Sequence, residues 1–298
     1  MLRVTIGSTE FMRKRCMNVA DSSVRQDTMP QRIPHHRRTD RGLGAALLCG
    51  LWLFAASPGA DAQSAPPLVA AASDLQFALA EIAEAFHADS GQRVRVVTGS
   101  TGNFARQIRA GARFEVFLAA DEQFVFDLYR DGFTRDQGEL YAIGRLVMVV
   151  PVGSTLPADG TLETLATALA ERRLRRFAIA NPDHAPYGMR AREALEHRGL
   201  WEALQPLLVM GENVSQAAQF ALSGSAQGGI VAYSLVLAPE VASRGAFELI
   251  PEQWHAPLRQ RMVLLQDASP AAEAFYDFMG TAAARTIMTR FGFDVPED

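Results

Sequence analysis

Short apolar runs and amphipathic segments alternate along the chain from residue 68 to residue 291. The first run, 68–72, stops at Ser73 and Asp74, and apolar residues then recur at helical spacing. The run at 94–97 likewise ends in a polar turn before the next amphipathic segment. Short apolar runs that alternate with helices predict an α/β fold with parallel sheets covered on both faces.

Short apolar runs predict the other strands, and apolar residues at helical spacing predict the other helices. Strands are expected at 94–97, 114–120, 141–151, 177–180, 207–210, 229–233, 247–251 and 261–266. Helices are expected at 74–88, 104–110, 121–130, 159–176, 189–197 and 216–222, with two more between 269 and 291.

Four of these strands run into a polar turn that opens a helix, at residues 73–75, 98–103, 181–188 and 211–215. The first turn of a helix has unpaired N–H groups and lies at the positive end of the helix dipole, so it is a ready anion site. In open α/β sheets, ligands bind beyond the carboxyl ends of the strands. One such turn alone is an ordinary helix cap, but four in one chain predict an anion site built from several helix starts.

The first 62 residues have the organisation of a secretory signal peptide. A basic stretch, 1–41, precedes an apolar run at 42–56 and the small-residue triplet Ala60-Asp61-Ala62. The apolar run is too short to span a bilayer comfortably. We therefore expect cleavage after Ala62 and a periplasmic protein without a membrane span. Met29 is an alternative translation start, and Arg37-Arg38 is an alternative twin-arginine signal.

Charge and cysteine content narrow the function classes. Residues 1–62 carry a net charge of +4, whereas residues 63–298 hold 20 basic and 28 acidic side chains, a net charge of −8. This acidic body argues against nucleic-acid binding, which needs clustered basic charge. Both cysteines, Cys16 and Cys49, lie in the leader, so no disulfide, thiolate metal site or cysteine nucleophile is expected in the body.

Six segments of the chain carry a resemblance to a known family. They are AAASDL (70–75), TGSTGNFARQIRAGARFEVFLAAD (98–121), ANPDHAPYGMRAREAL (180–195), GENVSQAAQFALSG (211–224), GGIVAYS (228–234) and AFYDFMGTAAARTIMTRFGF (274–293). In this order they resemble the periplasmic molybdate-binding proteins of ABC transporters. The resemblance implies a type II periplasmic-binding-protein fold, in which two α/β lobes close over an anion. The first lobe would comprise 66–145 plus 262–298 and the second 146–261, with hinges near Arg145 and Gln260.

The resemblance also implies which residues hold the oxyanion by hydrogen bonds. Carried over by motif position, they are Ser73, Thr101 with neighbouring Ser100, and the backbone N–H groups of Tyr187 and Val214. Asp74 follows Ser73, and a carboxylate beside a dianion would be repulsive. Its side chain is therefore expected to cap the helix or point away, leaving only its N–H near the anion.

One family feature is displaced in this sequence. Some members use a tyrosine hydroxyl in the segment that matches 229–234. Here the matching position is Ala232, and Tyr233 lies one residue along, where its side chain would face the other side of a strand. Tyr233 is therefore not expected to be a ligand.

Molybdate is a tetrahedral dianion at neutral pH, so its oxygens only accept hydrogen bonds and a suitable site needs donors alone. No Arg or Lys lies in the turns at 70–75, 98–103 or 211–215. The nearest basic residues, Arg106 and Arg190, lie inside their helices and can face outward. Hydroxyls, N–H groups and helix dipoles can hold a buried anion without a formal counter-charge.

Several alternatives remain open at this stage. Tungstate should bind as well, and sulfate also suits a donor-only site. A protonated phosphate would need a carboxylate acceptor, for which Asp74 is the candidate. A small organic acid would normally call for an arginine clamp. A hydrolase would need Ser73 or Ser100 activated by His184, although no G-x-S-x-G motif and no metal-ligand spacing appears.

The resemblance further implies partners. An ABC permease with its ATPase would receive the ligand, the binding protein would be a monomer, and no cofactor and no enzymatic activity are expected.

Overall fold

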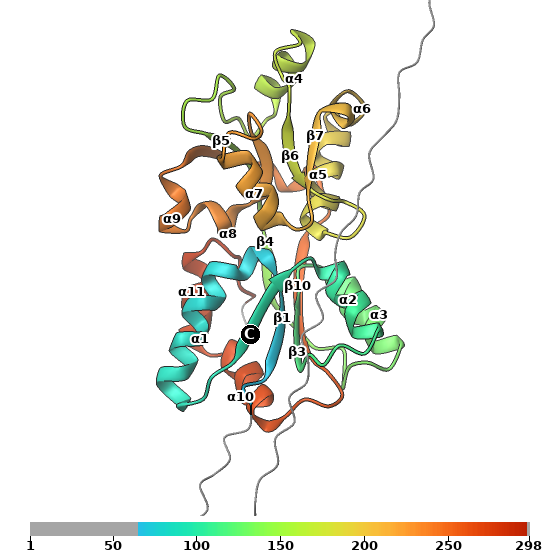
Figure 1. The fold of residues 1–298 in the computed structure, drawn as a ribbon, viewed down its shortest axis with the longest axis vertical. Coiled ribbons are helices and arrows are strands. Elements are labelled where there is room, and N and C mark those ends of the chain that lie inside the picture. The colour runs from blue at the N-terminus through green and yellow to red at the C-terminus, as the bar shows by residue number, and fades with distance from the viewer. Residues whose placement is uncertain (1–64, 297–298) are drawn as a thin grey trace, which may run out of the picture. The chain divides into compact units, whose positions relative to one another are not determined.

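The computed structural model describes residues 65–296, which contain ten strands in two five-stranded sheets (Figure 1). The expected signal peptide and its cleavage site after Ala62 lie outside the described residues. The strand order is β2-β1-β3-β10-β4 in the first sheet and β7-β6-β8-β5-β9 in the second. Each sheet packs with its own helices into one α/β unit. We call the unit around the β2-β1-β3-β10-β4 sheet the first lobe and the other unit the second lobe.

The first lobe is covered by helices on both faces of its sheet (Figure 1). Its strands are β1 Leu68–Ala72, β2 Arg95–Gly99, β3 Val116–Ala119, β4 Glu139–Gly144 and β10 Leu258–Leu264. Its helices are η1 Ser73–Leu75, α1 Gln76–Ser90, α2 Thr101–Arg109, α3 Glu122–Arg130, α10 Pro270–Met279 and α11 Ala282–Arg290. Strand β1 pairs in parallel with β2 and β3, whereas β10 is antiparallel to β3 and β4.

Alternation along the strands explains the two cores of this lobe. Val69 and Ala71 of β1 pack in the cluster that contains α1, α10 and α11, whereas Ala70 packs in the cluster that contains α2 and α3. Successive side chains of a strand point to opposite faces, so a strand that is apolar throughout serves both cores.

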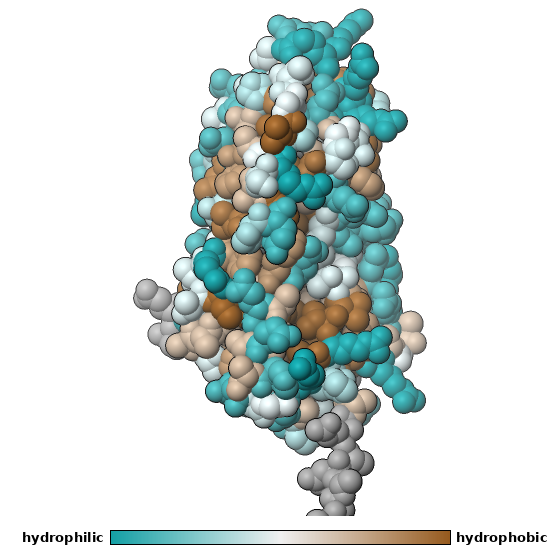
Figure 2. Space-filling model, turned by 60° about the vertical axis from the view of Figure 1, so that its left-hand side comes forward, coloured by the Kyte–Doolittle hydropathy of each residue, from teal (hydrophilic) through white to brown (hydrophobic). Residues whose placement is uncertain are grey.

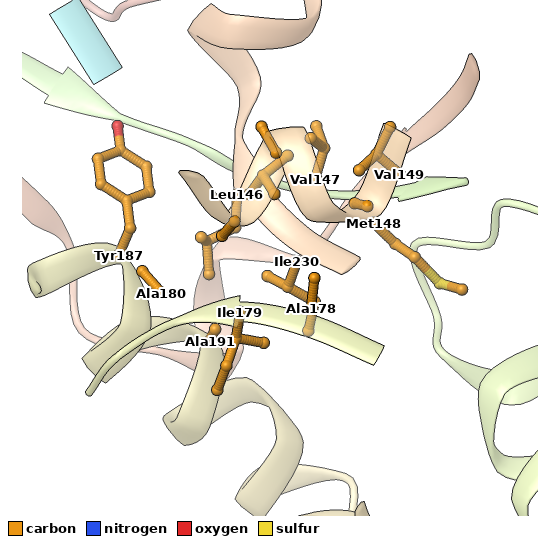
Figure 3. Packing of buried hydrophobic residues seen from close by; sticks show 14 of the residues in the cluster. Leu146, Val147, Met148, Val149, Ala178, Ile179, Ala180, Tyr187, Ala191 and Ile230 are labelled. Carbon is orange, nitrogen blue, oxygen red and sulfur yellow. The ribbon is translucent and has the colours of Figure 1, made fainter. Parts of the chain in front are cut away.

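The sheet of the second lobe also combines parallel and antiparallel strand pairs. Its strands are β5 Leu146–Pro151, β6 Phe177–Ala180, β7 Leu208–Gly211, β8 Gly229–Ala232 and β9 Gly245–Leu249. Its helices are α4 Glu163–Ala170, α5 Pro186–His197, α6 Trp201–Leu204, η2 Gln205–Leu207, α7 Val214–Leu222, α8 Tyr233–Val236, α9 Pro239–Ala242 and η3 Glu252–Trp254. Figure 3 shows its core, where side chains of β5 and β6 meet those of α5 and β8.

The apolar run expected as one strand at 141–151 is two strands in different sheets. Strand β4 ends at Gly144 and β5 begins at Leu146, so the chain passes between the lobes at Arg145. Hydropathy could not separate them, because both strands are buried and apolar. The chain returns to the first lobe at β10, whose residues 258–261 pair with β4. The second-lobe boundary predicted from the sequence, residue 261, is therefore wrong for these four residues.

The helix expected at 159–176 is limited to Glu163–Ala170. Leu162 and Arg172, on either side of it, have φ angles of 60° and 56°, a conformation that does not continue a right-handed helix. The side chain of Asp159 accepts hydrogen bonds from the N–H groups of Thr161 and Thr164, so residues 159–162 form a turn before the helix.

The surface mixes hydrophilic and hydrophobic residues on the face shown in Figure 2. Among the residues that the structure describes, no helix combines the length and the hydropathy needed to cross a membrane.

Candidate functional site

The four helix starts predicted from the sequence meet around one small chamber. Its cavity volume is about 10 Å³. The residues that line it come from both lobes and are Ala72, Ser73, Asp74, Gly99, Ser100, Thr101, Ala120, Ala185, Pro186, Tyr187, Asn213 and Val214. They lie where strands β1, β2, β3, β6 and β7 end, so the topology brings the carboxyl ends of parallel strands from two sheets face to face.

Ser73, at the end of β1, lies in contact with the start of α7 in the other lobe. The N–H of Ser215 donates to its Oγ at 3.2 Å, and the Ser215 hydroxyl donates to its carbonyl oxygen at 2.8 Å. Ser73 is 2% exposed. Because its Oγ accepts one hydrogen bond here, its own hydroxyl proton remains available for a ligand in the chamber.

Ser100 and Thr101 begin α2 and differ in what their hydroxyls do. The Ser100 hydroxyl donates to the carbonyl oxygen of His184 at 2.7 Å and lies 2.8 Å from His184 Nδ1. Thr101 Oγ1 accepts from the N–H of Ala120 at 3.0 Å, which fixes the start of α2 to the end of β3. Each hydroxyl is therefore also a structural contact, and Ser100 must give up its bond to His184 before it can donate to a ligand.

The backbone donors expected at Tyr187 and Val214 lie in the first turns of α5 and α7. In α7, the Ser215 N–H is used by Ser73 and the Gln216 N–H by the side chain of Asn213, which caps the helix. Val214 is thus the first-turn residue of α7 whose N–H remains for a ligand. In α5, Pro186 has no N–H, so the Tyr187 N–H is the first that the helix presents.

The carboxyl group of Asp74 takes part in hydrogen bonds between the two lobes, which the sequence did not predict. Its Oδ2 accepts a hydrogen bond from Tyr187 Oη at 3.0 Å and from Gln260 Nε2 at 2.6 Å. Tyr141 Oη in turn donates to Gln260 Oε1 at 2.8 Å. We call these four residues the Asp74 network. Figure 3 shows the Tyr187 hydroxyl turned away from the apolar side chains of its own lobe, which leaves it free for this contact with the other lobe.

Burial of Asp74 raises the pKa of its carboxyl group from 3.8 to about 6, although the hydrogen bonds from Gln260 and Tyr187 act in the opposite direction. Burial also raises the pKa values of Tyr187 and Tyr141, so both remain neutral donors. Glycine is required next to this network, because a Cβ on Gly144 would lie 2.2 Å from Tyr187 Oη.

No basic residue lines the chamber in the described part of the chain. Arg106 is hydrogen-bonded to Asn103 at an exposed position. Arg190 does not face outward as expected: its side chain is 15% exposed and pairs with Asp121 of the first lobe, with Nη2 2.5 Å from Oδ2. This pair joins the two lobes outside the chamber, so the arginine contributes to their contact and not to the anion site.

The remaining sequence candidates take structural places. Tyr233 begins α8 and packs against Phe247, with ring centroids 5.8 Å apart, and it does not line the chamber. His184 Nε2 lies 3.5 Å from the exposed carboxylate of Glu212. A serine, a histidine and a carboxylate are thus near one another, but the Ser100 proton is directed to the His184 carbonyl oxygen and not to the ring. Among the described residues, no cluster of His, Cys, Asp and Glu could hold a metal ion.

Sequence reasoning missed Gly102, Ser215, Gln260 and the side chain of Tyr187. The N–H of Gly102 donates to the His184 carbonyl oxygen at 3.0 Å across the two lobes. These residues act through contacts between segments that are far apart in the chain, so no local pattern marks them.

Two α/β lobes whose helix starts converge on one chamber are the architecture of periplasmic ligand-binding proteins. The family model described as "Bacterial extracellular solute-binding protein" matches residues 67–294. The chain is 34% identical over 251 residues to the molybdate-binding protein ModA of Rhodobacter capsulatus, an alignment that covers 83% of this chain and 93% of the relative. It is 35% identical over 235 residues to ModA of Azotobacter vinelandii, which covers 78% of this chain and 91% of the relative.

The solved periplasmic molybdate-binding protein of Azotobacter vinelandii superposes with a TM-score of 0.70 at 29% identity, over 78% of this chain and all of that one. The chain therefore belongs to the bacterial extracellular solute-binding protein family. The two-lobed α/β fold and the family predicted from the sequence are confirmed.

Proposed function

We propose that this protein captures molybdate outside the cytoplasm and delivers it to an ABC permease and its ATPase. The chamber carries this proposal: it offers hydroxyls and helix-start N–H groups from both lobes and no basic side chain. An oxyanion that only accepts hydrogen bonds suits such a set of donors. The curated relatives from Rhodobacter capsulatus and Azotobacter vinelandii are named molybdate-binding proteins, which supports the same ligand.

The oxyanion would be held by the Ser73 hydroxyl, the Ser100 and Thr101 hydroxyls, and the backbone N–H groups of Asp74, Tyr187 and Val214. Tungstate would bind at the same site, because it presents the same donor-only requirement. We further propose that the protein is a monomer, works without a cofactor, does not turn its ligand over, and reaches the periplasm through a signal peptide cleaved after Ala62.

Native mass spectrometry of the protein from residue 63 onward tests this proposal. Incubation with molybdate, tungstate, sulfate and phosphate in parallel should give one bound molybdate or one bound tungstate per chain. A sulfate or phosphate adduct without a molybdate adduct would overturn the proposal. A phosphate adduct would point to a hydrogen bond from protonated phosphate to the Asp74 carboxylate.

Replacing Ser73 with alanine should weaken molybdate binding by roughly 1–3 kcal/mol, the range for a hydrogen bond to a charged group. Ser73 lines the chamber and is 2% exposed, so water cannot easily replace its hydroxyl. Titration calorimetry on Ser73→Ala measures the change, and Ser225→Ala, at an exposed serine of the second lobe, serves as the matched control. Unchanged affinity in Ser73→Ala would remove Ser73 from the site.

A further inference from the structure

The carboxyl group of Asp74 has two oxygens in different situations. Oδ2 accepts hydrogen bonds from Tyr187 Oη and from Gln260 Nε2. Oδ1 is buried and has no hydrogen-bond partner among the described residues. The residue is 1% exposed, and it lines the chamber beside Ser73. A buried, unpaired carboxyl oxygen beside an anion chamber calls for an explanation, because such an oxygen normally has a partner.

The groups that contact Asp74 are neutral. They come from four elements: Tyr141 of β4, which acts through Gln260 of β10, Tyr187 of α5, and Ser234 of α8, whose hydroxyl donates to the Asp74 carbonyl oxygen at 2.8 Å. The only titratable side chains among them are the two tyrosines, which burial keeps protonated. Within residues 65–296, no cation is among the groups that act on the carboxylate.

A dianion in the chamber would add two negative charges to that of this carboxylate. Like charges at short range in a buried site repel each other strongly. This repulsion raises the pKa of a carboxyl group, so the group binds a proton more readily. The pKa of Asp74 is already raised to about 6 by burial, without any ligand. A ligand that carries two negative charges raises it further.

We propose that Asp74 takes up one proton from solvent when the oxyanion enters the chamber, so that capture of the dianion is coupled to protonation. This inference rests on the proposed function. The proton goes to Oδ1, because Oδ2 already accepts two hydrogen bonds and keeps both. The neutral carboxyl group then offers an O–H donor, and the loaded site carries two negative charges where an ionised Asp74 would give three. Asp74, which as a carboxylate would only accept hydrogen bonds, thereby becomes a donor like the other groups of the site.

The direction of the pH dependence follows from linkage. Binding raises the pKa of Asp74, so the loaded protein holds more protons than the free protein at pH values above about 6. Affinity for the dianion should fall as the pH rises through this range, by at most about tenfold per pH unit for one proton. Another titratable group near the chamber, His184, contacts Ser100 and is the competing source of such an effect.

Titration calorimetry with molybdate at pH 7.5, in two buffers with different ionisation enthalpies, counts the protons taken up. The unmodified protein should take up a substantial fraction of one proton per molybdate, and its Kd should increase several-fold between pH 6.5 and 8.5. Asp74→Asn, which carries a neutral amide of nearly the same shape, should bind molybdate with little proton uptake and a nearly constant Kd. The control Asp89→Asn, at the exposed far end of α1, should behave like the unmodified protein.

A second variant keeps the test independent of how well Asp74→Asn folds. Tyr187→Phe removes a hydrogen bond that lowers the pKa of Asp74. The pH dependence of Kd should therefore move to higher pH in this variant. Molybdate binding without proton uptake in the unmodified protein, or uptake that persists in Asp74→Asn, would overturn the inference and leave the proposed function intact. No molybdate binding at any pH would instead overturn the proposed function.

Discussion

Replacing Gly102 with alanine should weaken oxyanion binding by roughly ten- to a hundredfold, about 1–3 kcal/mol, the usual cost of forcing an extra carbon into a packed site. A Cβ at this position would lie 2.6 Å from the carbonyl oxygen of His184 and 3.1 Å from its Cα. Gly102 belongs to the first lobe and His184 to the second, and both contacts are with backbone atoms, which cannot swing aside. The added methyl group should hold the lobes apart.

The same substitution should leave the free protein folded and as stable as before. Gly102 lies within α2, where alanine is favoured over glycine by about 1 kcal/mol. Titration calorimetry for affinity and thermal unfolding for stability separate the two effects. Gly280→Ala is the matched control, because the nearest atom to its Cβ is 3.4 Å away. Normal affinity in Gly102→Ala would show that binding does not need the contact between Gly102 and His184.

Replacing Asp74 with asparagine should raise the free energy of unfolding of the ligand-free protein by up to about 3 kcal/mol at pH 7.5, and by much less near pH 4. The folded pKa of about 6 exceeds the ordinary value of 3.8, and each pKa unit corresponds to 1.36 kcal/mol. The folded protein therefore binds more protons than the unfolded chain between these two values. The stability that Asp74 contributes is complete below pH 4 and is lost as the pH rises through about 6.

Urea unfolding of both proteins at pH 4 and at pH 7.5 measures this difference without any ligand. Asp89→Asn supplies the control, because it removes one exposed carboxylate from the other end of α1. An Asp74→Asn variant with the same change in unfolding free energy at both pH values would contradict the expectation. It would mean that the carboxyl group of Asp74 does not titrate between them.

The parts of the site that are local in the chain could be predicted from the sequence. A strand that ends in Ser73, or in Gly99 and Ser100, and is followed at once by a helix places its hydroxyl and N–H groups beyond the sheet edge. The structure brings these turns to one chamber with those of Tyr187 and Val214. Each of these turns is formed by a few consecutive residues, so its residue pattern alone predicts it.

The Asp74 network could not be predicted in this way. Gln260 lies 186 residues from Asp74, within a strand whose polar residues gave no sign of a buried role. Its amide is 0% exposed, and its position is fixed by the pairing of β10 with β4. Repulsion between a carboxylate and a dianion argues against the Asp74 carboxylate as a ligand, but it does not predict that Tyr187 of the opposite lobe holds this carboxylate in place.

The order of strands in the first sheet has a consequence for how the chain folds. Strand β4 joins that sheet only through β10, and its outer edge bridges Asp294. The second sheet, in contrast, uses only strands between residues 146 and 249. Pairings between segments distant in sequence form late, because the loops between them must be closed first. The sheet of the second lobe can therefore form from one continuous segment of the chain. The sheet of the first lobe can be completed only when β10, the last strand in the sequence, pairs with β3 and β4.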